Sequence, residues 1–321
     1  MKRTWIHHAI IVNEGRRFAG SVVIEGEKIQ EVIEGDGAPA AVCDEQIDAQ
    51  GCFLLPGVID DHVHFRDPGL THKADMATET AAAAAGGVTS FMDMPNCNPQ
   101  TTTLEALENK FKDAATKCIV NYSFYFGATN NNADQLKALD KTHVCGVKLF
   151  MGASTGNMLV DRMEALKKIF SEAGMLIATH CEDQQIIREN TERFKQQYGE
   201  DLDISFHPLI RSEEACYHSS ALAVQLAKET GARLHILHIS TARELGLLED
   251  RPLHEKKITA EACVSHLMFC DEDYAQFGAR IKCNPSIKTK ADRDALRKAL
   301  TTNLIDVIAT DHAPHLLSEK E

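Results

Sequence analysis

The pattern of hydrophobic and polar positions changes character near Pro56. Before it, short β-rich runs at residues 4–13, 20–25 and 27–33 are separated by glycines, a pattern typical of hairpins. After it, apolar runs of strand length alternate with segments of helical length. This alternation predicts a parallel sheet whose strands are joined by crossover helices.

The second region contains eight expected strands and seven expected helices. The strands are 58–64, 88–93, 119–126, 144–150, 175–180, 233–239, 257–262 and 305–310, and the helices are 74–85, 103–116, 132–139, 161–173, 212–230, 241–249 and 291–301. This is the element count of an α/β (β/α)8 TIM barrel. The polar connection 181–211 could hold one more helix, at 183–197, as a wall of an active site.

We therefore expect two domains. Residues 1–55 would form a small β-sandwich segment, and residues 56–321 would form the barrel. A closed barrel usually has a helix after its eighth strand, whereas only residues 312–321 follow here. The sequence thus predicts a barrel that lacks its C-terminal continuation.

The composition excludes several classes of binding partner. The formal net charge of −13 argues against nucleic acid or an anionic membrane surface, and no apolar stretch is long enough to cross a bilayer. The ten cysteines include no C-x-x-C pair and follow no export signal, as expected for reduced thiols in the cytoplasm. We expect a small-molecule substrate, no nucleic acid, no membrane and a homo-oligomer.

The first expected barrel strand ends in two histidines. His62 and His64 are two residues apart, so on a strand both point to the same side, where two imidazoles can bind one metal ion. The turn at Pro68-Gly69 follows directly, which places the pair at the C-terminal end of the strand, where barrels carry their active sites. The alternative is two unrelated histidines on an exposed edge strand.

Four further strand ends carry residues of matching chemistry. The fourth strand holds Lys148 within an apolar run, the fifth and sixth end at His180 and His238, and the eighth ends at Asp311. Singly, each histidine could be structural and the lysine could extend to solvent. Together they predict a metal site at one barrel mouth. Six other histidines are expected to be structural: His7, His8, His207, His218, His235 and His254.

Imidazoles and carboxylates suit Zn²⁺ or a similar divalent ion, which lowers the pKa of bound water toward neutrality. A protonated lysine is a poor ligand and costly to bury. Carbamylation of Lys148 by CO2 would remove its charge and supply two oxygens that bridge two ions.

The chain resembles the dihydroorotases of the amidohydrolase superfamily, cyclic amidohydrolases, from about Pro56 to His315. The motifs that carry the resemblance are His62-Val63-His64-Phe65-Arg66-Asp67-Pro68-Gly69, Met94-Pro95-Asn96-Cys97-Asn98-Pro99, Gly146-Val147-Lys148-Leu149-Phe150-Met151, Asn284-Pro285-Ser286 and Ala309-Thr310-Asp311-His312-Ala313-Pro314-His315. Two features depart from a uniform family pattern. Many relatives have Pro-Pro-Leu-Arg in place of residues 285–288, which weakens any role for Lys288, and some have aspartate at the bridging position.

The resemblance implies two divalent metal ions, with Zn²⁺ favoured. His62, His64 and Asp311 would hold one ion, His180 and His238 the second, and carbamylated Lys148 would bridge them. A metal-bound hydroxide would open the ring, with Asp311 as general base and then general acid. Arg66, Asn96, Asn284 and His315 would contact the substrate.

The expected reaction is the reversible conversion of L-dihydroorotate to N-carbamoyl-L-aspartate in pyrimidine biosynthesis. Arg66 matters most, because a guanidinium can hold a carboxylate with two hydrogen bonds. Its alternative role is a surface salt bridge to Asp67 or Asp75, and Asn96 could be a simple turn residue. The rival functions are a dihydropyrimidinase, a hydantoinase or an allantoinase, and a non-catalytic relative that uses the barrel for assembly.

Overall fold

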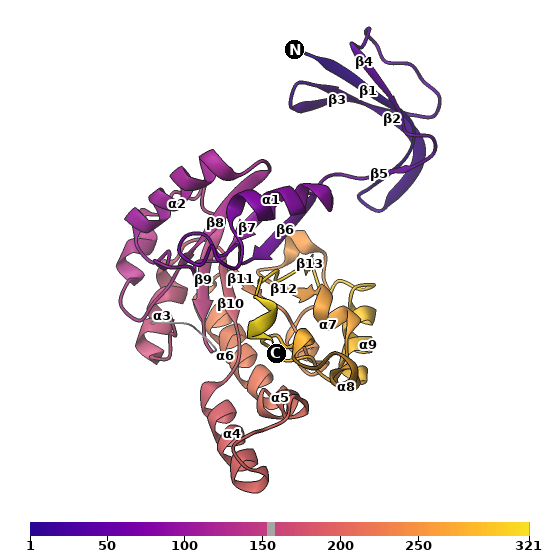
Figure 1. The fold of residues 1–321 in the computed structure, drawn as a ribbon. Coiled ribbons are helices and arrows are strands. Elements are labelled where there is room, and N and C mark those ends of the chain that lie inside the picture. The colour runs from indigo at the N-terminus through magenta and orange to yellow at the C-terminus, as the bar shows by residue number, and fades with distance from the viewer. Residues whose placement is uncertain (153–157, 321) are drawn as a thin grey trace. The chain divides into compact units, whose positions relative to one another are not determined.

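The computed structural model describes residues 1–152 and 158–320 (Figure 1). It contains two compact units, Met1–Val58 and Ile59–Glu321, which are treated separately below. Among the described residues, no helix combines the length and the apolar character needed to span a membrane.

The N-terminal unit is one five-stranded sheet in the order β3-β2-β1-β4, with β5 also paired to β1. β1 to β3 form the expected antiparallel hairpins, and β4 and β5 run parallel to β1. Ala9, Ile11 and Val22 form its small buried core. The strands are β1 (Arg3–Asn13), β2 (Arg16–Glu25), β3 (Lys28–Glu34), β4 (Glu45–Asp48) and β5 (Phe53–Leu54).

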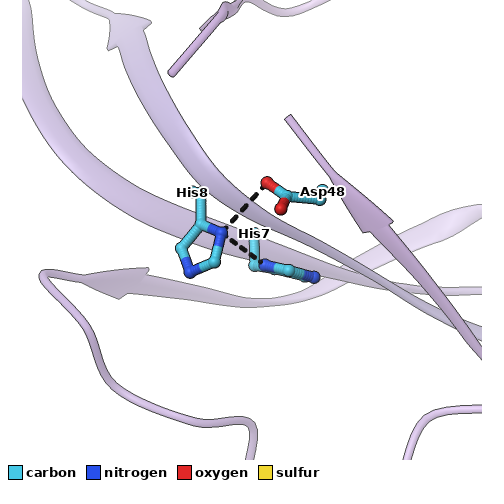
Figure 2. Close-up of side chains that lie close together, drawn as sticks. All are labelled: His7, His8 and Asp48. Atoms are coloured by element: carbon cyan, nitrogen blue, oxygen red, sulfur yellow. Dashed lines mark hydrogen bonds and ion pairs between the residues drawn. The ribbon is translucent and has the colours of Figure 1, made fainter. Parts of the chain in front are cut away.

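A β-bulge in β1 brings two consecutive histidines together (Figure 2). The register against β2 shifts between Ile6 and Ala9, and His8 adopts a φ of 53°. Neighbouring side chains of a regular strand point to opposite faces, whereas here the Nδ1 atoms of His7 and His8 are 3.1 Å apart. His8 Nδ1 is also 3.0 Å from Asp48 Oδ1. The His8–Asp48 hydrogen bond ties the bulge to β4. The structural role expected for both histidines stays a prediction.

The second unit is an eight-stranded parallel barrel, which confirms the expected fold class. The strands follow one another in sequence order, from β6 to β13. A parallel bridge between Val63 and His312, with a 2.7 Å hydrogen bond from His64 N to His312 O, joins the two ends of the sheet. The strands are β6 (Val58–Val63), β7 (Val88–Asp93), β8 (Asn121–Gly127), β9 (Gly146–Phe150), β10 (Ile177–His180), β11 (Leu234–Ile236), β12 (Ile258–Cys263) and β13 (Val307–Ala309).

Helices follow the expected alternation. They are α1 (Met76–Ala85), α2 (Leu104–Lys117), α3 (Met163–Glu172), α4 (Gln184–Tyr198), α5 (His207–Ile210), α6 (Glu213–Thr230), α7 (Val264–Met268), α8 (Tyr274–Phe277) and α9 (Lys290–Ala299). Of these, the short helices α5, α7 and α8 were not expected. Short 3-10 helices occur at Ala133–Ala138, Ile204–Phe206, Glu244–Leu247, Leu253–Glu255, Asp271–Asp273, Gly278–Ile281 and Leu317–Glu319.

Two expected α-helices, at 132–139 and 241–249, are 3-10 helices instead. In the second, the buried Glu244 carboxylate accepts the backbone N–H groups of Ser240 and Thr241 at 3.3 and 3.2 Å. A side chain that bonds its own preceding backbone favours a tight turn over a continuing α-helix.

The strands divide their side chains between two cores. In β8, Phe124 and Phe126 belong to the large cluster, whereas Tyr125 packs in a small cluster with Met94, Ala178 and Leu237. Alternation along each strand therefore separates the residues inside the barrel from those under the helices. Lys148 and His180 lie on the same strand faces as the small cluster, which directs them into the barrel.

Candidate metal centre and substrate cavity

All ten expected site residues line one cavity of about 510 Å³ in the barrel unit. They come from the C-terminal ends of the strands and the loops that follow them. The ten are His62, His64, Arg66, Asn96, Lys148, His180, His238, Asn284, Asp311 and His315.

The first group of potential ligands gathers around Asp311. Its Oδ1 atom lies 3.2 Å from His62 Nε2 and 3.1 Å from His64 Nε2. Burial raises the pKa of Asp311, but the neighbouring histidines His62 and His64 outweigh it and hold that pKa well below its usual value. Asp311 is therefore an anion facing two imidazole nitrogens.

The second group is the pair His180 and His238. His180 Nδ1 and His238 Nε2 are 2.9 Å apart, and both rings are buried. Burial lowers the pKa of His180 and lowers that of His238 well below its usual value. These histidines are thus neutral at pH 7, the state in which imidazole binds metal. The His62 and His238 rings are 5.3 Å apart, so the two groups are adjacent.

Lys148 lies in the same cavity and is 1% exposed. Its Nζ atom sits 4.7 Å from the centre of the Phe150 ring. Burial lowers the pKa of Lys148 to about 8. About a tenth of the side chain is then an uncharged amine at pH 7, far more than for an ordinary lysine, and this form is a nucleophile.

Three of the histidines are held from behind. His62 Nδ1 bonds Glu261 Oε1 at 2.6 Å, and His180 Nε2 bonds Glu182 Oε2 at 2.9 Å. His64 Nδ1 bonds Asn96 Oδ1 at 2.7 Å. An acceptor on one ring nitrogen keeps the proton there and directs the lone pair of the other nitrogen into the cavity.

Asn96 therefore does more than either role expected for it. Its oxygen accepts a hydrogen bond from His64, and its side chain also lines the cavity.

Three residues of the site have left-handed backbone conformations, although none is glycine. The φ angles of Arg66, His238 and Asp311 are 65°, 37° and 49°. Such conformations cost on the order of 1–3 kcal/mol each and persist where the surrounding structure enforces them. Here they turn the side chains into the cavity at the point where each strand ends.

Arg66 faces the cavity next to His315. Its Nε donates to the Pro314 carbonyl at 3.0 Å, and its Nη2 lies 3.1 Å from His315 Nε2. Burial and the Arg66 charge both lower the pKa of His315. The alternative salt bridge to Asp67 or Asp75 is wrong. Asp67 pairs with Lys117, and Asp75 caps α1.

The loop that carries Arg66 packs tightly against the loop that carries Asn96. Gly69 has a φ of 84°, and a Cβ atom there would lie 1.7 Å from the carbonyl oxygen of Asn98. Only glycine allows both this conformation and this approach. The close contact brings together the loops that carry Arg66 and Asn96.

The amidohydrolase family model matches residues 53–319 of this sequence. The chain belongs to the amidohydrolase family.

Curated relatives in this family carry more than one name. The chain is 32% identical over 316 residues to an allantoinase of Deinococcus radiodurans, which covers 95% of this chain and 68% of the relative. It is 34% identical over 310 residues to a dihydroorotase of Methanosarcina mazei, covering 93% of this chain and 66% of the relative. The chain thus spans about two thirds of the length of these amidohydrolases.

Solved structures give the same picture. An L-hydantoinase (dihydropyrimidinase) from Arthrobacter aurescens superposes with a TM-score of 0.92 at 25% identity, covering all of this chain and 71% of that one. A dihydropyrimidinase from Brevibacillus agri gives a TM-score of 0.85 at 25% identity, covering 98% and 70%. The names of these amidohydrolases span several cyclic amides, so membership does not select a substrate.

The donor set of this amidohydrolase fits divalent ions. Four imidazoles and one carboxylate converge on one cavity, and three of the imidazoles have their outer nitrogens bonded to an acceptor. That arrangement is the usual support for metal ligands.

Sequence reasoning missed two buried carboxylates. Glu261 lies within the apolar strand β12, and Glu182 follows His180 by two residues. Glu261 resembles Lys148 in being an ionisable residue inside an apolar run, and that signal could have revealed it. Eight other residues also line the cavity: Phe150, Ser265, Lys282, Cys283, Thr310, Ala313, Glu319 and Lys320. Lys288 instead donates to Ser286.

Proposed function

We propose that this amidohydrolase is a dihydroorotase, which interconverts L-dihydroorotate and N-carbamoyl-L-aspartate. The observation that carries the proposal is Arg66, a guanidinium beside His315 in the cavity that holds the six potential ligands. Among cyclic amides, one with a ring carboxylate makes the best use of such a group, because arginine binds carboxylates through paired hydrogen bonds.

Two divalent ions would be held by His62, His64 and Asp311 on one side and by His180 and His238 on the other, with Lys148 between them. When bound, such ions lower the pKa of water and polarise a carbonyl oxygen.

The chain's own groups supply binding and proton transfer. Arg66 binds the substrate carboxylate, while Asn96 and Asn284 contact the ring from the loops that follow β7 and β12. Asp311 is an anion before the reaction, so it can accept a proton from the attacking water. It then delivers that proton to the ring nitrogen as the amide bond breaks. Ring closure follows the reverse order.

Lys148 would act as a carbamate. Its uncharged amine adds to CO2, forming a C–N bond and releasing one proton, and the product is an anion in place of a buried cation. The lowered pKa of Lys148 favours this reaction. Carbon-13 NMR after incubation with labelled bicarbonate should show a carbamate signal that Lys148→Ala lacks. Identical spectra for the two proteins would contradict the modification.

A substrate panel tests the function. Dihydroorotate, dihydrouracil, hydantoin and allantoin are offered to the metal-loaded protein, with Asp311→Asn as the inactive control. We expect dihydroorotate to be preferred and Arg66→Gln to lose that preference. Preference for an uncharged ring would instead support the second candidate, a hydantoinase or allantoinase, which the allantoinase relative at 32% identity favours.

A further inference from the structure

A buried carboxylate outside the cavity touches both halves of the candidate metal centre. Glu261 lies on β12 and is fully buried. Its Oε1 atom accepts from His62 Nδ1 at 2.6 Å and from the backbone N–H of His238 at 2.9 Å. One oxygen atom therefore bonds a residue of each ligand group.

The first contact determines which nitrogen of His62 can bind metal. Because Glu261 accepts the Nδ1 proton, the Nε2 lone pair of His62 faces the cavity, 3.2 Å from Asp311 Oδ1. The negative charge also makes the imidazole a stronger donor toward a cation. The first metal position thus depends on Glu261 for both orientation and basicity.

The second contact holds a strained backbone. His238 has a φ of 37°, and its ring Nδ1 has no hydrogen-bond partner among the described residues. His180 and His62 are held through their rings, whereas the Glu261 contact holds His238 through its N–H. The backbone bond therefore contributes to the direction in which the His238 ring points.

Further buried polar residues support Glu261 itself. Its second oxygen, Oε2, is 3.4 Å from His235 Nε2, which is in turn 3.5 Å from Asp61. His235 Nδ1 bonds Thr259 Oγ1 at 2.8 Å. His235, expected from the sequence to be structural, therefore contacts the Glu261 carboxylate, which in turn accepts a hydrogen bond from His62.

We propose that Glu261 is a positioning residue that sets the ligand geometry of both metal positions at once. This inference rests on the proposed metal centre. It predicts that loss of Glu261 weakens the binding of both ions, although Glu261 would contact neither ion. A residue that supports only one group, such as Glu182 behind His180, should weaken one ion.

The experiment measures cobalt binding to Glu261→Ala and Glu261→Gln without substrate. Glutamine keeps an oxygen acceptor of the same shape and loses the charge. We expect Glu261→Ala to lower the affinity for both ions by roughly 100-fold, at the upper end of the 10- to 100-fold range of such supporting residues. Glu261→Gln should restore part of that lost affinity. The visible absorption of bound cobalt should change in both variants.

Glu244→Gln is the matched control. Glu244 is also buried, and its carboxylate bonds only Ser220, Ser240 and Thr241 among the hydrogen bonds of the described residues. It should lower the melting temperature of the metal-free protein without changing cobalt affinity. Glu182→Gln should weaken one ion only. Circular dichroism of each metal-free variant separates misfolding from lost binding.

Three results would count against the inference. Wild-type cobalt affinity in folded Glu261→Ala, loss of one ion only, or equal losses in Glu244→Gln would each overturn it. The proposed function fails separately, if the wild-type protein binds two ions but does not hydrolyse dihydroorotate.

Discussion

A buried ion pair next to the loops that carry Arg66 and Asn96 offers a quantitative test of the structure. Lys110 on α2 and Asp93 at the end of β7 form an ion pair of 2.5 Å, and their side chains are 1% and 2% exposed. Asp93 Oδ1 also accepts the Phe65 N–H at 2.7 Å, and Lys110 donates to the Met94 carbonyl at 3.0 Å. The pair therefore holds the starts of the two loops that carry Arg66 and Asn96.

Lys110→Met should be strongly destabilising. It leaves the Asp93 carboxylate buried without its cation, and removing one partner of a buried pair costs roughly 3–5 kcal/mol. Asp93→Asn should cost a similar amount, because it leaves an unpaired ammonium. The double variant removes both charges and should cost clearly less than the sum, with a coupling energy of about 2 kcal/mol or more.

Urea denaturation measures the free energy of unfolding of the wild type, the two single variants and the double variant. Lys112 on the same helix pairs with Glu108 at 2.6 Å, but both side chains are about two-thirds exposed. Lys112→Met should therefore cost less than about 1 kcal/mol. The reasoning is refuted if Lys110→Met costs no more than Lys112→Met, or if the double variant shows simple additivity.

Three further outcomes are expected. Arg66→Lys keeps the charge but loses the paired hydrogen bonds, so the KM for dihydroorotate should rise roughly tenfold or more while that for dihydrouracil changes little; equal changes would contradict carboxylate binding. Burial lowers the pKa of His266 to about 4 from 6.5, so below pH 6.5 the unfolded chain binds a proton that the folded chain excludes. The contribution of His266 to the free energy of unfolding is therefore complete above pH 6.5 and falls by roughly 3 kcal/mol toward pH 4. Urea titrations of His266→Gln should lack this loss. Gly69→Ala should lower the melting temperature and the activity, because its Cβ would overlap the Asn98 carbonyl; a wild-type melting curve would contradict the loop contact.

The barrel and the cavity-facing residues could be predicted because both follow from local patterns. Strand alternation and chain turns after His64, His180 and Asp311 are visible in a single sequence. The left-handed backbone at His238 and Asp311 was not visible, since nothing in those residue types requires it. The Lys110–Asp93 pair was also invisible, because a helix position and a strand end meet only in three dimensions.

The supporting residues escaped prediction for a deeper reason. An imidazole offers two nitrogens, and the sequence says only that one could bind a cation. Which nitrogen faces the cavity depends on the acceptor behind the ring, and these acceptors lie at separations from 2 residues, for Glu182 behind His180, to 199, for Glu261 behind His62. Glu261 sits on the seventh strand, the one strand between the histidine of the sixth and the aspartate of the eighth to which we assigned no ligand. A barrel closes its strands into a ring, so a position on β12 that gives no ligand to the cavity can still bond His238, which follows the neighbouring β11, and His62 on β6, which lies beyond β13. Strand β12, to which the sequence assigned no metal ligand, therefore carries the carboxylate that bonds a residue of each ligand group.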